Sequence, residues 1–173
     1  MGPIGPTAVD AMMAAMSKQL SIDLTYDAPL TEVTAMLADP AFRERVCEAQ
    51  HALANAVSIE GGTVAITYTQ PVQGVPGFAT KFVGDTIEVH QDETWSADFT
   101  KGDITVTLPG KPGELGGTAV VVERGGRTVE TVSLTAKVSV PLLGGKLEDL
   151  VVSIFEKALR KEHQVGVAWL RGE

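Results

Sequence analysis

Alternating hydrophobic and polar positions predict a series of β-strands. The first strand is expected at residues 20–26, where Leu20 and the apolar residues that follow it alternate with Ser, Asp and Thr, as in a strand with one buried face. The clearest strand is expected at residues 132–140 and ends at Pro141. Glycine pairs that are typical of hairpin turns separate several strands in the middle of the chain. These middle strands are expected around residues 57–59, 63–68, 82–95, 104–108 and 119–122.

Helical spacing predicts two short helices after the first strand and one long helix at the C-terminus. Asp and Pro at 27–29 and at 39–40 are helix-start signals, because Asp caps a helix and Pro is tolerated in its first turn. The second short helix is expected to carry Phe42 and Leu53. In the long helix, from about residue 146 to 169, apolar residues recur every three or four positions and form a wide face.

The order of these elements predicts an α+β fold: strand, two helices, six strands and one long helix. A meander of antiparallel strands curls by its own twist, and a helix with a wide apolar face needs a large surface to pack on. We therefore expect a curved antiparallel sheet of about seven strands wrapped around the C-terminal helix. It forms a single domain over residues 16–173. Residues 1–15 are expected to be a disordered extension, or to precede a natural start at Met16.

Charge and cysteine content exclude several classes of protein. The formal net charge of −8 argues against a nucleic-acid partner, because phosphate contacts need clustered Lys and Arg. The single cysteine, Cys47, excludes an internal disulfide and a Cys-only zinc site, and fits a reducing compartment. No apolar run is long enough for stable membrane insertion. We expect a cytoplasmic protein.

Two segments carry a resemblance to a known family. They are LSIDLTYDAPLTEVTAMLADPAF at 20–42 and SVPLLGGKLEDLVVSIFEKALRKE at 139–162. With the order of elements, they resemble the START-like superfamily (SRPBCC), whose helix-grip fold includes birch-pollen-allergen-like proteins and polyketide cyclases. More specifically, they look like an uncharacterised, mostly actinobacterial family, domain of unknown function 2505. The resemblance implies an apolar cavity between sheet and helix, which holds lipids, steroids, hormones or polyketides in many relatives; it carries over no active-site residues.

Catalytic and metal-binding motifs are weak in this sequence. Cys47 and His51 are four residues apart in a predicted helix, so they could form a nucleophile with its base or half of a metal site. No third partner is visible, and a buried cysteine beside a surface histidine is the favoured interpretation. Gly145-Lys146 is followed by Leu147 rather than Ser or Thr, unlike a phosphate-binding loop. We expect no catalytic residue, no metal and no cofactor.

The long helix also carries a small group of charged residues. Lys157, Arg160 and Lys161 form a basic cluster that Glu156 and Glu162 interrupt. We interpret all five as a solvated helix face with local ion pairs.

Glu93 is the candidate polar group of the cavity. It shares one side of a predicted strand with Val89 and Trp95, and these two should face the core. A buried carboxylate is costly unless it is paired or hydrogen-bonded, so an inward Glu93 suggests a ligand contact. A β-bulge after Val89 would instead turn it outward. Asp85 falls on the same side and could lie at the cavity mouth.

The leading hypothesis is a binding or carrier module for a hydrophobic small molecule that is lipid, steroid or polyketide-like. A pocket of about 300 Å³ or more would be required. The second hypothesis is a cyclase- or hydrolase-like enzyme that uses Glu93 as general base, and the third is an interaction module whose cavity is filled by side chains. An enzyme is the less favoured of the first two. The expected ligand-binding residues are Tyr68, Phe82, Glu93, Trp95, Phe155 and Leu159.

Overall fold

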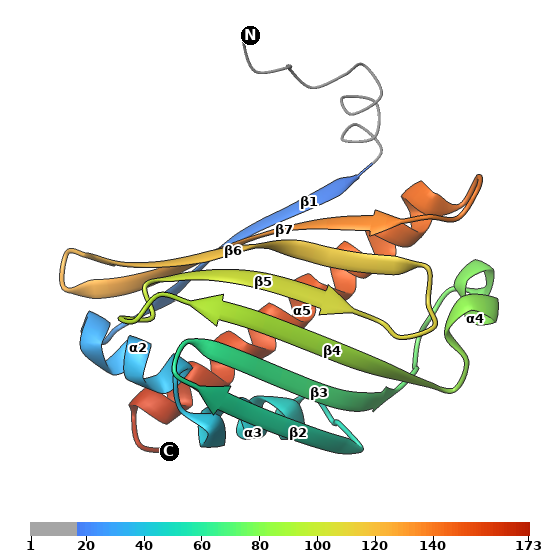
Figure 1. Cartoon of the computed structure of the whole chain (residues 1–173). Helices are drawn as coiled ribbons and strands as arrows, with labels where there is room; N and C mark the ends of the chain where they lie inside the picture. Colours follow the sequence, from blue (N-terminus) through green and yellow to red (C-terminus); the bar gives the residue numbers. More distant parts are fainter. Residues whose placement is uncertain (1–16) are drawn as a thin grey trace, which may run out of the picture.

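The fold is a single curved antiparallel sheet that wraps around a long helix (Figure 1). A computed structural model of the chain describes residues 17–173, so the prediction for residues 1–15 lies outside the described residues. The strands lie in the order β1-β7-β6-β5-β4-β3-β2. They are β1 (Lys18–Tyr26), β2 (Ala54–Glu60), β3 (Thr63–Pro71), β4 (Thr86–Trp95), β5 (Lys101–Thr107), β6 (Gly113–Arg124) and β7 (Arg127–Val138).

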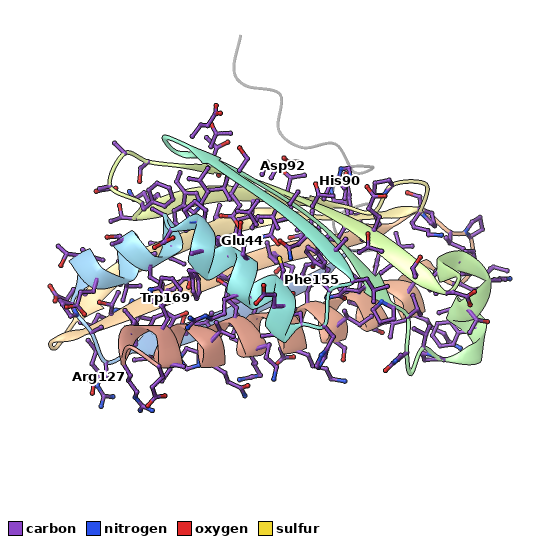
Figure 2. All side chains as sticks on the ribbon, turned by 90° about the horizontal axis from the view of Figure 1, so that it is seen from below. Glu44, His90, Asp92, Arg127, Phe155 and Trp169 are labelled. Carbon is purple, nitrogen blue, oxygen red and sulfur yellow. The ribbon has the colours of Figure 1, made fainter. Side chains whose placement is uncertain are left out.

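Three helices cover one face of the sheet. The long helix α5 (Gly144–Leu170) contacts β1 and β7, and two short helices, α2 (Leu30–Leu37) and α3 (Pro40–Ala49), contact α5 in turn. Seen from below, all three lie on the same side of the sheet (Figure 2). The predicted α+β helix-grip architecture, with its order of strands and helices, is therefore confirmed.

Strand alternation explains how the sheet and the helices share one core. In β1, the residues Leu20, Leu24 and Tyr26 are buried while their neighbours along the strand are exposed. β1 pairs with β7 so that Leu20 lies opposite Leu134, and the apolar residues of both strands face the helices. A shift of one residue would turn every one of these side chains to solvent, so burial of one face sets the register.

The predicted long strand from residue 82 was wrong. Residues 77–83 form a short helix, α4 (Gly77–Val83), and β4 begins only at Thr86. Pro76 stands before the first helical residue, and Gly84 ends the helix at φ 69°, a backbone conformation that glycine adopts without strain. Phe82 therefore belongs to a helix, which the short run of apolar residues did not distinguish from the start of a strand.

Two details of the predicted short helices were also wrong. α3 ends at Ala49, His51 takes φ 62°, and Leu53 is 64% exposed rather than packed under the helix. Pro29 occupies the N-cap position of α2, and no side chain caps that helix, so Asp27 does not serve as its cap. The second helix start was predicted correctly, since the Asp39 side chain accepts a hydrogen bond of 2.9 Å from the Ala41 amide.

Two glycines allow aromatic rings to approach the backbone closely. Trp95 lies opposite Gly102 in the sheet, and a Cβ on Gly102 would meet the indole ring at 2.7 Å. A Cβ on Gly166 of α5 would meet the Tyr26 ring at 2.8 Å. Tyr26 is fully buried. At Gly166 the long helix therefore lies so close to the Tyr26 ring of β1 that there is no room for a side chain.

Replacing Gly166 with alanine is expected to lower the free energy of unfolding by about 1–3 kcal/mol, the usual cost of overpacking a core. The physical reason is the contact between the new methyl group and the Tyr26 ring. Gly145→Ala in the same helix meets open space and should be neutral or slightly stabilising. Chemical denaturation of both variants checks this, and equal stabilities would show that the Tyr26 contact does not constrain α5.

Candidate functional site

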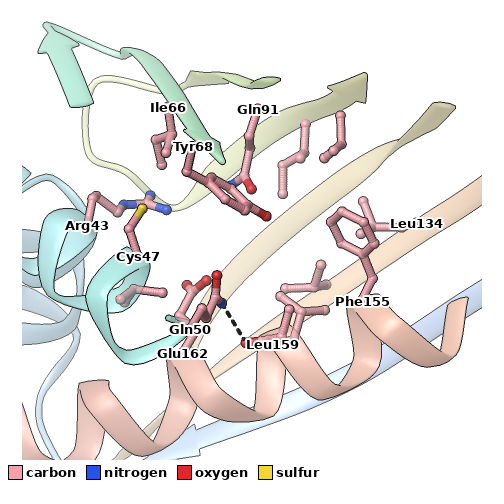
Figure 3. A pocket seen from close by; sticks show the side chains of 15 residues that line it. Arg43, Cys47, Gln50, Ile66, Tyr68, Gln91, Leu134, Phe155, Leu159 and Glu162 are labelled. Carbon is pink, nitrogen blue, oxygen red and sulfur yellow. Dashed lines mark hydrogen bonds between the residues drawn. The ribbon is translucent and has the colours of Figure 1, made fainter. Parts of the chain in front are cut away.

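A cavity lies between the inner face of the sheet and the helices α3 and α5 (Figure 3). Its volume is about 50 Å³, which leaves room for one or two water molecules. Most of its wall is apolar. The sheet contributes Ile66, Tyr68, Ile104, Val106, Val132 and Leu134, and α5 contributes Phe155, Ala158 and Leu159.

Polar side chains gather around the part of the cavity that α3 borders. Arg43 comes from α3, Gln50 is the residue that caps the end of this helix, Gln91 comes from β4 and Glu162 from α5. The Gln50 amide donates a hydrogen bond of 3.2 Å to the Ala158 carbonyl and so ties α3 to α5 (Figure 3). The cavity therefore has the composition of a small-molecule pocket, which is mainly apolar with a few placed polar groups.

A buried ion pair between Arg43 and Glu93 borders this polar part. The guanidinium donates two hydrogen bonds to the carboxylate, at 3.1 Å to Oε1 and 2.9 Å to Oε2. Its Nε donates a third hydrogen bond, of 2.9 Å, to the Leu37 carbonyl. Arg43 is 4% and Glu93 2% exposed. The pair joins α3 to β4 in the bidentate geometry that gives strong charge-assisted hydrogen bonds.

Glu93 has no acceptor capacity to spare. The Gln91 amide donates to Oε1 at 2.5 Å and the Trp95 indole donates to Oε2 at 2.6 Å, in addition to the two bonds from Arg43. Four donors match the roughly four lone-pair sites of a carboxylate. Glu93 thus points inward without a bulge. Because all four acceptor sites of its carboxylate are engaged, the structure argues against the hypothesis that Glu93 acts as a general base.

Two further carboxyl groups, Glu130 and the partly buried Glu162, belong to the same interior. Glu130 is 3% exposed on β7, on the same face as the cavity-lining Val132, and Glu162 reaches into the cavity from α5 (Figure 3). The Tyr26 hydroxyl and Oε2 of Glu130 are both buried, and the two groups lie close enough to act on each other as donor and acceptor, although their geometry falls outside that of an ordinary hydrogen bond. Three carboxyl groups, those of Glu93, Glu130 and Glu162, act on the guanidinium of Arg43.

Burial changes the acidity of these groups. Loss of solvent contact, reinforced by the charge of Glu162, raises the pKa of Glu130 to about 8. Burial likewise raises the pKa of Glu162, although the nearby Arg43 works in the opposite direction. The pKa of the Tyr26 hydroxyl lies well above its ordinary value, because of burial first and of the charge of Glu130 second. With a pKa of about 8, the carboxyl group of Glu130 keeps a proton at neutral pH.

The predicted ligand-binding residues fall into three groups. Tyr68, Phe155 and Leu159 line the cavity. Glu93 and Trp95 are buried beside it and bonded to each other. Phe82 lies on α4, away from the cavity wall, because the segment is helical. Asp85 is exposed in the turn before β4 and does not line the cavity either.

Sequence reasoning missed three charged residues of the interior, the buried Arg43 and Glu130 and the partly buried Glu162. Glu162 was interpreted as part of a solvated helix face, yet it follows Phe155 and Leu159 at helical spacing and lines the cavity with them. Glu130 stands two residues before Val132 on the inward face of β7. The helical spacing of Glu162 and the strand alternation of Glu130 could have identified both residues as inward-facing. Their charge instead favoured an exposed position.

Cys47 and His51 do not form a site together. Cys47 is buried at the cavity wall, and burial raises the pKa of its thiol to about 11, so it is a poor nucleophile. His51 is exposed in the turn after α3. Within residues 17–173, no group of three or more His, Cys, Asp or Glu side chains is arranged to hold a metal ion. None of the helices in this range has the length and hydropathy needed to cross a membrane.

Removing the guanidinium of Arg43 is expected to destabilise the protein by about 3–5 kcal/mol, because Glu93 would remain buried without its counter-charge. Arg43→Met tests this by chemical denaturation. Arg160→Met, which breaks an exposed pair with Glu156, should cost less than about 0.5 kcal/mol. The double variant Arg43→Met, Glu93→Met should recover part of the loss. A small effect of Arg43→Met would show that water relieves the buried charge.

Stability is expected to fall as the pH rises from about 5 to about 8. In that range the folded protein keeps a proton on Glu130, while the unfolded chain, with a pKa near 4.5, has lost it. Each such proton contributes a slope of about 1.4 kcal/mol per pH unit. Glu130→Gln should flatten the curve and raise the stability at pH 8, whereas Glu60→Gln on the exposed β2 should not. Chemical denaturation at several pH values in this range measures the effect. If the stability of Glu130→Gln depends on pH in the same way as that of Glu60→Gln, Glu130 is not the group that takes up the proton.

Comparison with known proteins gives relatives of similar length and fold. An uncharacterised protein of Mycobacterium tuberculosis is 26% identical over 90% of this chain and 98% of its own length. The aromatase/cyclase ZhuI from Streptomyces sp. R1128 has a TM-score of 0.65 at 12% identity, over 88% of this chain and 92% of its own. The protein TTHA0849 from Thermus thermophilus has a TM-score of 0.63 at 16% identity, over 87% and 98%.

The structural neighbours are helix-grip proteins, and at these identities they show the fold alone. The predicted helix-grip fold is therefore confirmed, and the predicted family is confirmed by sequence. The model of the proteins of unknown function DUF2505 matches residues 21–170, which include most of β1, all of β7 and all of α5. The chain belongs to the DUF2505 family.

Proposed function

We propose that this protein binds a small hydrophobic molecule in the cavity between the sheet and α5, in the cytoplasm. The observation that carries the proposal is the composition of the cavity wall, in which aliphatic and aromatic side chains from two layers surround an interior with polar groups on one side. Helix-grip neighbours with this architecture include an aromatase/cyclase. The proposed ligand is lipid, steroid or polyketide-like, as the resemblance to START-like proteins implies, and the apolar wall supports this class.

The volume of the cavity sets a condition on this proposal. At about 50 Å³ it is smaller than the roughly 300 Å³ of ordinary ligand pockets, so the ligand must displace side chains as it enters. Phe155 and Leu159 are suited to this movement, since both line the cavity and both are only partly buried. Phe155 projects from α5 on the side that faces the sheet (Figures 2 and 3).

The anchoring of α5 is compatible with such an opening. Its most extensive contacts are with β1, β7, α2 and α3, whereas Ile66, Tyr68 and Ile104 on β3 and β5 face it across the cavity. A ligand can therefore enter between α5 and these strands while the β1–β7 side of the helix layer stays in place. The small resting volume also favours a second candidate, an interaction module whose cavity stays filled by side chains.

Native mass spectrometry of the purified protein is expected to show a discrete added mass that disappears on denaturation, and an apolar fluorescent probe should be displaced by a solvent extract of the sample. Ala158→Trp places an indole in the cavity and should weaken probe binding by about tenfold or more, because it occupies the space that the probe needs. The probe dissociation constant is the quantity to measure.

Leu142→Ala is the matched control, because Leu142 is fully exposed in the turn before α5 and its replacement should leave probe binding unchanged. Thermal denaturation of both variants verifies that they are folded. An apo mass together with no probe binding to the wild type would favour the interaction module. Equal probe affinity in Ala158→Trp and wild type would place the ligand outside this cavity.

A further inference from the structure

The hydroxyl of Tyr68 is a polar group on the cavity wall that the fold itself leaves without a hydrogen bond. Tyr68 alternates with Val64 and Ile66 on the inward face of β3 and is only 7% exposed. Its ring points from β3 into the cavity, toward the side where α5 carries Phe155 (Figure 3). Among residues 17–173, no group is hydrogen-bonded to this hydroxyl.

The polar neighbours of this phenol on the cavity wall are, by contrast, tied to the fold. Arg43 and the Gln91 amide both donate to the Glu93 carboxylate, and the Gln50 amide donates to the Ala158 carbonyl. Buried polar groups are nearly always hydrogen-bonded, and a buried tyrosine usually finds a partner for its hydroxyl. A phenol that is buried, unpartnered and directed into a cavity therefore indicates a partner from outside the chain.

The phenol of Tyr68 is a hydrogen-bond donor at neutral pH. Burial, reinforced by the charges of Cys47 and Glu162, raises the pKa of the Tyr68 hydroxyl above its ordinary value, so the hydroxyl keeps its proton. A neutral phenol offers one O–H to an acceptor. The complementary group on a ligand is therefore an oxygen atom that can accept this bond.

The charges on the cavity wall favour an acceptor without charge. The guanidinium of Arg43 is already bonded to Glu93, and Glu162 lines the same cavity. A carboxylate on the ligand would bring a negative charge toward the carboxyl group of Glu162, which repels it when ionised. A ketone or hydroxyl oxygen accepts the O–H of Tyr68 without this repulsion.

We propose that Tyr68 determines the specificity of the cavity by donating a hydrogen bond to a ketone or hydroxyl oxygen of an uncharged, otherwise apolar ligand. This inference rests on the proposed function, since it assigns the polar contact of the same ligand. A ligand without such an oxygen leaves the phenol buried and unpaired, which costs free energy. The cavity therefore discriminates between an oxygen-bearing ligand and the bare hydrocarbon of the same shape.

The test compares α-tetralone with tetralin, the same bicyclic skeleton without the carbonyl group, as competitors of an apolar fluorescent probe. Dissociation constants are measured for the wild type and for Tyr68→Phe, which removes only the hydroxyl. Tyr68→Phe is expected to weaken α-tetralone binding relative to tetralin binding by about three- to tenfold, the usual effect of one neutral hydrogen bond. The infrared stretching frequency of the bound carbonyl should rise in Tyr68→Phe, because the carbonyl loses its donor.

Tyr26→Phe is the matched control, because Tyr26 is a buried tyrosine that does not line the cavity. Its ratio of the two dissociation constants should stay at the wild-type value. Thermal denaturation of Tyr68→Phe should show a stability equal to or above that of the wild type, since no group of the fold loses a partner. A marked loss of stability would show that the hydroxyl is bonded within the fold instead.

The outcomes separate the role of Tyr68 from the existence of the cavity. If neither compound displaces the probe, or if the ratio of dissociation constants or the carbonyl frequency is the same in Tyr68→Phe and wild type, the assignment of Tyr68 is overturned and the cavity remains. A wild-type protein that binds no apolar probe overturns the proposed function as well.

Discussion

The buried pair between Arg43 and Glu93 is the interaction on which the rest of the interior depends. It connects a helix that follows the first strand to the middle of the sheet, and its two charges satisfy each other in a region shielded from solvent. Gln91 and Trp95 complete the shell around the carboxylate. Because the guanidinium of Arg43 is bonded to Glu93, the neighbouring carboxyl groups of Glu130 and Glu162 form no ion pair with it.

That constraint divides the interior into two regions. On one side, the apolar residues of β3, β5 and α5 enclose a small space that a hydrophobic molecule could enlarge. On the other side, Tyr26 and Glu130 are buried next to each other, and Glu162 lines the cavity from α5.

Most of the fold could be predicted from the sequence because the signals that define it are local. Period-two alternation identified β1 and β7, and three- and four-residue spacing identified α5. The segment containing Phe82 failed because a short apolar run fits either a helix or a strand. The site was harder to predict, since the partner of Arg43 lies 50 residues away, and no local pattern reports that contact. Glu162 sat at an apolar position of α5, yet its charge outweighed its spacing.

The strand order has a consequence for how the chain reaches its native state. β1 is at one edge of the sheet and pairs with β7, so the first strand of the described chain has no partner until synthesis has passed Arg127. α5, which covers the inner face, follows later still. During synthesis the part of the apolar face that α5 covers therefore stays exposed until α5 has been made, and such long-range pairing is slow and prone to aggregation. Early protection by a chaperone would suit this topology.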